Sequence, residues 1–271
     1  CGLDIEDYTV KVSYAPLDSN HAVEFKYQKA IQNSAQSYLG LTDADFNALA
    51  LRRYGLSALD NIATDHDQVI LRYSWQATED LSVSATYYDN RHKRDWFKTE
   101  GIDFDGSSNA QNFSRTSWSN VINAVNRNEN LAGFTPAQLR QILDGTLDTV
   151  SGSIQLRSNA REYFSRGVQL NLQWAVALGR TQHDISFGLR IHEDEEDRLQ
   201  RNSTFSQQSG SLVLDDLGLL GNAGNRIQAA EALAVHIYDR IEFGRWVISP
   251  GLRYENIDQQ RQRWEIRPSR T

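Results

Sequence analysis

The clearest pattern in the sequence is a strict alternation of apolar and polar residues in eight separate segments. In the first segment, Tyr8, Val10 and Val12 alternate with polar residues. Because successive side chains of a β-strand point to opposite faces, each segment predicts a strand with one apolar and one polar face. The predicted strands cover residues 7–14, 21–28, 69–75, 81–87, 168–174, 185–191, 233–237 and 246–254.

The connections between these strands alternate between short and long. The short ones carry turn-forming residues such as Pro16, Gly179 and Gly244, which predict hairpins. They cover residues 15–20, 78–80, 176–180 and 242–245. The long ones cover residues 29–64, 90–160 and 194–226.

This layout predicts the fold class. Unstructured loops beyond about 12–15 residues are uncommon in compact soluble domains, whereas short turns at one end and long loops at the other are typical of outer-membrane β-barrels. We therefore predict an all-β chain: an antiparallel transmembrane β-barrel segment of about eight strands, with long, partly helical loops at one end.

Large aromatic residues on the apolar faces support the membrane interpretation. One lies next to each of the four short turns: Tyr14, Trp75, Trp174 and Trp246. Amphipathic rings prefer the boundary between membrane and water, and barrels carry them as girdles. Aromatic residues also favour strands in general, but their position beside all four turns favours a girdle.

The long loops contain two helix signals. Thr42 is placed to cap a helix over residues 43–53, with acidic residues in its first turn and Gly55 beyond its end. Thr135 with Pro136 opens a second helix that ends near residues 144–145. The stretch 106–120 is rich in Gly, Ser and Asn and receives no assigned structure.

Composition narrows the class of protein. Only 39% of the 271 residues are hydrophobic, which disfavours the fully buried parallel sheet of an α/β enzyme. The net charge of −7 argues against nucleic acid as a partner. Cys1 is the single cysteine, so no internal disulfide is expected, and a lipidated N-terminus at Cys1 is a minor alternative. Without any Met, residues 1–271 are expected to be an internal part of a longer chain.

Sequence motifs for catalysis are absent. Residues 192–196 lack the second His of a zinc-protease helix, and the acidic residues near Asp43 and Asp45 depart from a calcium loop at positions 48 and 54. No phosphate-binding loop or nucleophile elbow is present. We predict neither an enzyme nor a bound cofactor or metal.

The polar faces of the strands are rich in cations at the long-loop end. Strand parity places nine Arg and His residues and one Trp inward: His66, Arg72, His92, Arg94, Trp96, Arg161, Arg190, His192, His236 and Arg253. Positive charge in an acidic chain indicates either an anionic ligand or inward ion pairs, for instance with acids of residues 193–197. The sequence does not separate these two possibilities.

Three stretches resemble a known family. Residues 38–46 with 52–54 resemble an outer loop of TonB-dependent receptors of the ferric-dicitrate type. Residues 232–241 and 249–255 are similar to a strand pair common across that superfamily, and residues 163–167 are similar to a more generic strand start. The plug domain, the TonB-contacting box and the closing aromatic strand of the family are not recognised in this sequence.

The resemblance implies a receptor of the bacterial outer membrane, surrounded by outer-membrane lipid and lipopolysaccharide. Such receptors take up ferric chelates through a plugged barrel of roughly 22 strands. The chain would then be a partial barrel domain, and TonB would act through a plug domain outside it. The expected cargo is ferric citrate or a related carboxylate siderophore.

Seven residues are the candidates for binding this cargo. Guanidinium groups form paired, charge-assisted hydrogen bonds to carboxylates, and the His, Gln and Tyr side chains at the same level could donate to or orient the complex. The candidates are Arg94, Arg161, Arg190, His92, His192, Gln68 and Tyr88.

Two alternatives remain open at this point. Eight strands can close on themselves, which would give a small outer-membrane barrel that serves as an adhesin or structural protein. Alternatively, the apolar faces could pack against each other in a soluble β-sandwich binding module.

Overall fold

The computed structural model describes residues 2–106 and 108–265. The alternative of a lipidated Cys1 therefore lies outside the described residues. Within the described part, no helix has both the length and the apolar character needed to cross a membrane.

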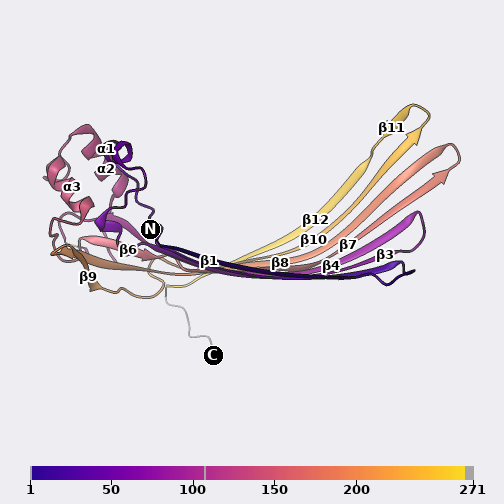
Figure 1. The fold of residues 1–271 in the computed structure, drawn as a ribbon, viewed down its shortest axis with the longest axis horizontal. Coiled ribbons are helices and arrows are strands. Elements are labelled where there is room, and N and C mark those ends of the chain that lie inside the picture. The colour runs from indigo at the N-terminus through magenta and orange to yellow at the C-terminus, as the bar shows by residue number, and fades with distance from the viewer. Residues whose placement is uncertain (1, 107, 266–271) are drawn as a thin grey trace.

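All strands belong to one antiparallel sheet, which Figure 1 shows as a long arc with the helices at one end and the hairpin turns at the other. The long strands follow one another as neighbours in chain order. They are β1 (Leu3–Tyr14), β2 (His21–Ser34), β3 (Asn61–Gln76), β4 (Leu81–Ile102), β7 (Arg161–Leu178), β8 (Thr181–Gln208), β10 (Gly224–Phe243) and β12 (Gly251–Arg263). The short strand β11 (Trp246–Ile248) also pairs with β10.

All eight predicted strands and all four predicted hairpins are confirmed. The last predicted strand is divided into β11 and β12 by Ser249 and Pro250, because proline has no N–H to continue the ladder. The strands extend well beyond their predicted ends at the long-loop end, and β8 alone has 28 residues. The chain is therefore an antiparallel β-barrel segment of the predicted type.

Register joins the apolar residues into one continuous face. A single row crosses seven strands through directly paired residues: Val12, Phe25, Leu71, Tyr87, Val168, Ile191 and Leu233. Each of these side chains is exposed, and Ile191 retains 59% of its accessible surface. On β7 this face runs from Val168 to Leu178, which is about 33 Å along the strand and about 25 Å in height at the usual tilt.

The sheet arrangement decides between the two open alternatives and the barrel segment. The described residues form a single sheet, so no second sheet covers the apolar face, as a β-sandwich requires. The edge strands β1 and β12 do not pair with each other in residues 2–106 and 108–265, so the segment is not a closed eight-stranded barrel. The aromatic residues predicted beside the turns lie at those strand ends and are exposed.

The long loops fold into a small, layered cap, seen at the left of Figure 1. Its elements are α1 (Asp43–Ala48), η1 (Gly55–Ser57), β5 (Thr116–Ser117), α2 (Trp118–Arg127), α3 (Pro136–Asp144), β6 (Ile154–Ser158) and β9 (Ser211–Asp216). The buried apolar residues of the chain gather here, including Leu56, Val121, Leu139, Ile142 and Ile154. This explains the low hydrophobic content of the chain. The long sheet has apolar residues on one face only and does not enclose a core of its own.

The helix predictions were right in part. The α3 helix has the predicted start and stop, with a capping box between Thr135 and Gln138 and Gly145 at φ 80° beyond its end. The α1 helix begins after Thr42 as predicted but ends at Ala48 rather than at residue 53. Beyond it, Arg52 pairs with Asp45 of α1 and Asp144 of α3, and Arg53 donates to the Ala35 carbonyl at 2.7 Å. The α2 helix begins inside the stretch that received no assignment.

One buried carboxylate joins two loops of the cap. Asp45 accepts hydrogen bonds from Thr42 Oγ1 at 2.7 Å and Tyr54 OH at 2.6 Å, and it pairs with Arg52 at 2.9 Å and with Arg140 of α3. Burial alone would raise the pKa of this carboxyl, but the hydrogen bonds from Tyr54, Thr42 and Arg140 lower the pKa below its ordinary value.

Replacing Asp45 by Asn is therefore expected to destabilise the cap by about 1–3 kcal/mol, because the partners of a buried acceptor lose their charge-assisted bonds. A lowered pKa means that this stabilisation is present at neutral pH and is lost as the pH falls through the folded-state pKa. Hydrogen exchange of residues 118–144 in parent and Asp45→Asn receptor would measure it. Unchanged protection at pH 7 would contradict the assignment.

Candidate functional site

The polar face at the long-loop end brings three of the predicted site residues into contact. Tyr88 OH lies 2.7 Å from His192 Nδ1, Arg190 Nε donates to Tyr88 OH at 3.0 Å, and Arg190 Nη2 lies 3.1 Å from His192 Nδ1. On the other side of the ring, Nε2 of His192 faces Asp194 Oδ2 at 3.1 Å.

A glycine makes this cluster possible. Tyr88 of β4 and His192 of β8 are both paired with Gly167 of β7, so they meet across the strand between them. A Cβ at position 167 would lie 2.6 Å from Tyr88 OH. We infer that Gly167 is required here because any side chain would push the tyrosine out of the cluster.

Arg94 and Arg161 form a second group, further toward the cap. They are direct cross-strand neighbours on β4 and β7. Arg161 pairs with Glu196 at 3.1 Å, so for this arginine the predicted ion pair with the acidic run is present. Arg94 makes no ion pair with any described residue, and its Nε is buried without a hydrogen-bond partner among them. One of the two cations is therefore available to an anion.

The other two candidates lie beside these groups rather than within them. The His92 ring stands between those of His66 and Tyr163, at centroid distances of 5.9 and 6.0 Å. Gln68 accepts from Lys26 at 2.9 Å and donates to Asn90 at 2.8 Å. Gln68 thus belongs to a polar ladder across β2, β3 and β4, and the structure does not bring it to the His192 cluster.

The structure also reveals cations that the sequence interpretation missed. Arg198, Arg226 and Arg263 continue the line of Arg94 and Arg161 on the next three strands. All three fall in stretches taken as loop or lie beyond the last predicted strand. The polar alternation of these strands continues past the apolar face, but without apolar residues it gives no strand signal.

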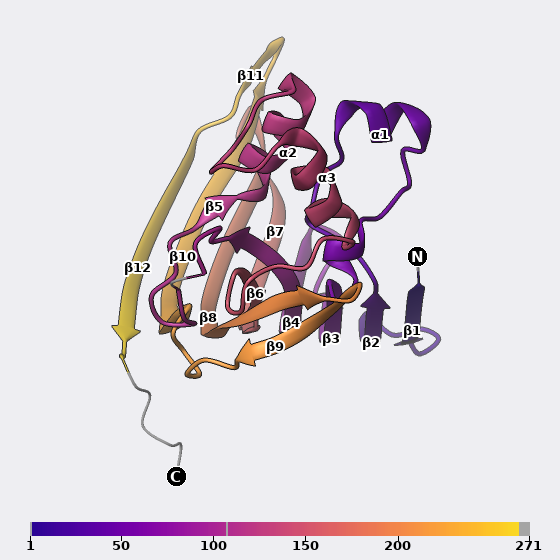
Figure 2. The same cartoon turned by 90° about the vertical axis from the view of Figure 1, so that its left-hand side faces the viewer.

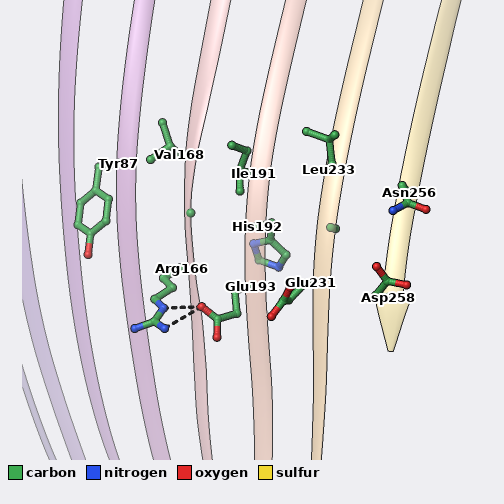
Figure 3. Close-up of a pocket in the computed structure, with 12 residues that line it drawn as sticks. Tyr87, Arg166, Val168, Ile191, His192, Glu193, Glu231, Leu233, Asn256 and Asp258 are labelled. Atoms are coloured by element: carbon green, nitrogen blue, oxygen red, sulfur yellow. Dashed lines mark hydrogen bonds and ion pairs between the residues drawn. The ribbon is translucent and has the colours of Figure 1, made fainter. Parts of the chain in front are cut away.

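A groove of about 570 Å³ crosses the opposite face of the sheet (Figure 3). Apolar side chains such as Val168 and Ile191 line one part, and Glu231 and Asp258 lie at its charged end. Arg166 and Glu193 pair there at 2.7 Å. Most of these residues alternate with those of the polar face, so the groove lies at the charged border of the apolar face. His192 of the candidate site is also among its lining residues.

No metal site is evident in the described ranges: no three His, Cys, Asp or Glu side chains of residues 2–106 and 108–265 are grouped as ligands. The candidate site is a set of guanidinium, imidazole and hydroxyl groups on the polar face.

No family model matches the chain. It is similar in fold to several solved structures. The ferric citrate transporter FecA in its unliganded form matches with a TM-score of 0.66 and 17% identity over 96% of this chain and 30% of that one. The siderophore receptor PiuA from Acinetobacter baumannii matches with a TM-score of 0.63 and 12% identity over 96% of this chain and 36% of that one.

The ferric-catecholate import receptor Fiu from E. coli K12, in its open form, matches with a TM-score of 0.58 and 16% identity over 96% of this chain and 38% of that one. The chain thus spans about a third of the length of these structures. They are outer-membrane β-barrels named as transporters and receptors, which supports the fold of an antiparallel β-barrel segment.

Proposed function

We propose that the chain is part of the barrel of a TonB-dependent outer-membrane receptor that takes up a ferric chelate bearing free carboxylates, such as ferric citrate. The observation that carries this proposal is the direct pairing of Arg94 with Arg161 on the polar face beside the cap. Arg190 is a third cation of the same face, further toward the turns, where it contacts Tyr88 and His192. The fold shared with receptors for ferric chelates supports it.

In this proposal the polar face is the lumen of the barrel. Arg94 and Arg161 attract the carboxylates of the chelate, since a guanidinium offers two parallel N–H donors to each carboxylate. Arg190, held by Tyr88 and His192, supplies a second, already oriented donor. His92 lies two residues from Arg94 on β4 and adds a further donor beside Arg94 and Arg161. Gln68 and its ladder line the adjoining wall.

The opposite, apolar face contacts the lipid and lipopolysaccharide of a bacterial outer membrane. Its aromatic ends lie at the periplasmic boundary, and the cap lies outside the cell, because short turns face the periplasm in such barrels. TonB would act through a plug domain in another part of the protein.

The binding test uses full-length receptor carrying Arg94→Ala, Arg161→Ala or Arg190→Ala separately. Each loss of a charge-assisted contact is expected to cost about 1.5–3 kcal/mol, which is roughly a tenfold to hundredfold weaker affinity for ferric citrate. Arg240→Ala is the matched control, because Arg240 pairs with Glu242 and Asp184 near the short turns. If all three variants fold and bind within twofold of the parent, the site assignment is wrong.

Topology gives an independent prediction. A nonspecific protease added to intact cells is expected to cut between β4 and α2, in the mostly exposed stretch 109–115, where Ala110 alone is buried, and to spare the exposed turn 78–80. The two stretches differ only in the side of the membrane on which the proposal places them. Cleavage at 78–80 with 109–115 intact would reverse the topology.

A further inference from the structure

We propose that the polar face carries an extended polyanion-binding strip, made of Arg94, Arg161, Arg198, Arg226 and Arg263. This inference rests on the proposed function for its natural cargo, and it specifies the shape of that cargo. The five arginines are named together below as the arginine row.

The arginine row follows from strand register. Arg94 pairs with Arg161, Arg161 with Arg198, Arg198 with Arg226, and Arg226 with Arg263. The five residues thus lie side by side on β4, β7, β8, β10 and β12, which Figure 2 shows as neighbouring strands that end beside the loops. Neighbouring strands are about 4.8 Å apart, so the row spans roughly 19 Å at the backbone.

Placing like charges directly opposite each other destabilises a sheet. Here the arrangement is repeated across four consecutive strand pairs, in a chain whose net charge is −7. Such a row needs negative charge from elsewhere to offset the repulsion.

The described residues supply little of this negative charge. Glu196 pairs with Arg161 and Arg198, at 3.1 Å each. Arg94, Arg226 and Arg263 make no ion pair within residues 2–106 and 108–265, and the Nε atoms of Arg94 and Arg226 are buried there without a hydrogen-bond partner. The ends of the row are therefore its open positions.

The next row toward the turns adds neutral and positive donors. Tyr163, Glu196, Gln228 and Arg261 are paired across β7, β8, β10 and β12. Glu196 is the single acid in this second row, so the surface beside the arginine row does not neutralise it. A ligand lying along the row would find the donors of Tyr163, Gln228 and Arg261 beside its path.

These features select a class of ligand. A small monovalent anion satisfies two guanidinium groups at most and leaves the rest repelling each other. A ligand with several carboxylates spread over about 10 Å or more, or two small chelates side by side, engages three or more strands at once. We therefore infer that the strip favours extended polycarboxylates over compact monocarboxylates.

The test measures binding of iron-free probes to full-length receptor by calorimetry at low ionic strength. The probes are a hexaglutamate peptide, inorganic tripolyphosphate and acetate, and the variants are Arg226→Gln and Arg263→Gln, with Arg240→Gln as control. The parent and the control should bind hexaglutamate, and each row variant should bind it at least tenfold more weakly. Acetate should bind none of them. If tripolyphosphate binds more tightly than hexaglutamate, the preferred ligand of the strip is a polyphosphate and not a polycarboxylate.

Two results would overturn the strip. One is equal hexaglutamate binding by parent and row variants. The other is no binding by any of them together with a changed thermal midpoint in the row variants, which would show that the row pairs with an acidic segment of the receptor itself.

Uptake of ferric citrate separates this inference from the proposed function. Normal uptake by both row variants would leave the proposed function intact and would show that the strip is not part of the transport path. Probe binding by a parent receptor that takes up no ferric citrate would contradict the proposed function alone.

Discussion

Replacing Leu170 by Arg is expected to cost the barrel about 2–4 kcal/mol, the usual penalty for an arginine on the lipid face near the bilayer midplane. Leu170 lies on β7 between Ala85 and Leu189, in the middle of the exposed apolar face. The expected result is a lower yield of folded receptor in lipid vesicles and a lower urea midpoint.

The neighbouring residue gives a matched control. Asn171 lies on the polar face and is paired with Ser84 and Gly188. Asn171→Arg should fold into vesicles with a midpoint close to that of the parent, because its side chain points to the lumen. Equal midpoints for Leu170→Arg and the parent would show that this face does not contact lipid.

Replacing Leu139 by Ala is expected to destabilise the cap by about 2–5 kcal/mol, the range for removing a fully buried leucine side chain. Leu139 of α3 has no accessible surface and belongs to the apolar core formed by α2, α3, η1 and β6. Because this core is separate from the exposed apolar face of the sheet, the cap should open while the barrel remains folded.

Two readouts distinguish these effects in the Leu139→Ala receptor. Hydrogen exchange should rise in residues 118–144, and resistance of the barrel to heat in detergent should stay unchanged. Leu51→Ala is the control, since Leu51 is 84% exposed in the same cap. Loss of barrel and cap together would contradict their independence, and unchanged exchange would contradict the core.

The sequence was most informative where one face of a strand is apolar. Tyr87, Val168 and Ile191 alternate with polar residues, so the strands that cross the apolar face could be predicted. Beyond that face both sides of each strand are polar, and residues 192–208 of β8 carry no alternation of hydrophobicity. Their strand structure comes from pairing with β7, β10 and β9, which local sequence does not encode.

The helices of the cap show a similar limit. Thr135, Pro136 and Gly145 provide a complete start and stop signal, and α3 was predicted. The α2 helix had a usable signal as well, because Trp118, Val121 and Ile122 have helical spacing after the N-cap Ser117. That signal was obscured by the polar residues that precede it.

The candidate site depended on parity and on register. Parity alone placed Arg94 and Arg161 on the polar face, and register then showed that they are direct neighbours. The contact between Tyr88 and His192 could not be predicted from sequence, because it depends on both residues being paired with the same glycine, Gly167. The arginines at the far end of the row were missed because they lie beyond the apolar face, where the strands give no hydrophobic alternation.

The most direct test of the central claim is uptake of radioactive iron from ferric citrate by cells whose only ferric citrate receptor is the full-length protein. The account predicts uptake that requires TonB and falls at least tenfold in the triple variant Arg94→Ala, Arg161→Ala, Arg190→Ala, at equal receptor levels in the outer membrane. Uptake by this variant at the parental rate, or no TonB-dependent uptake by the parent, would contradict it.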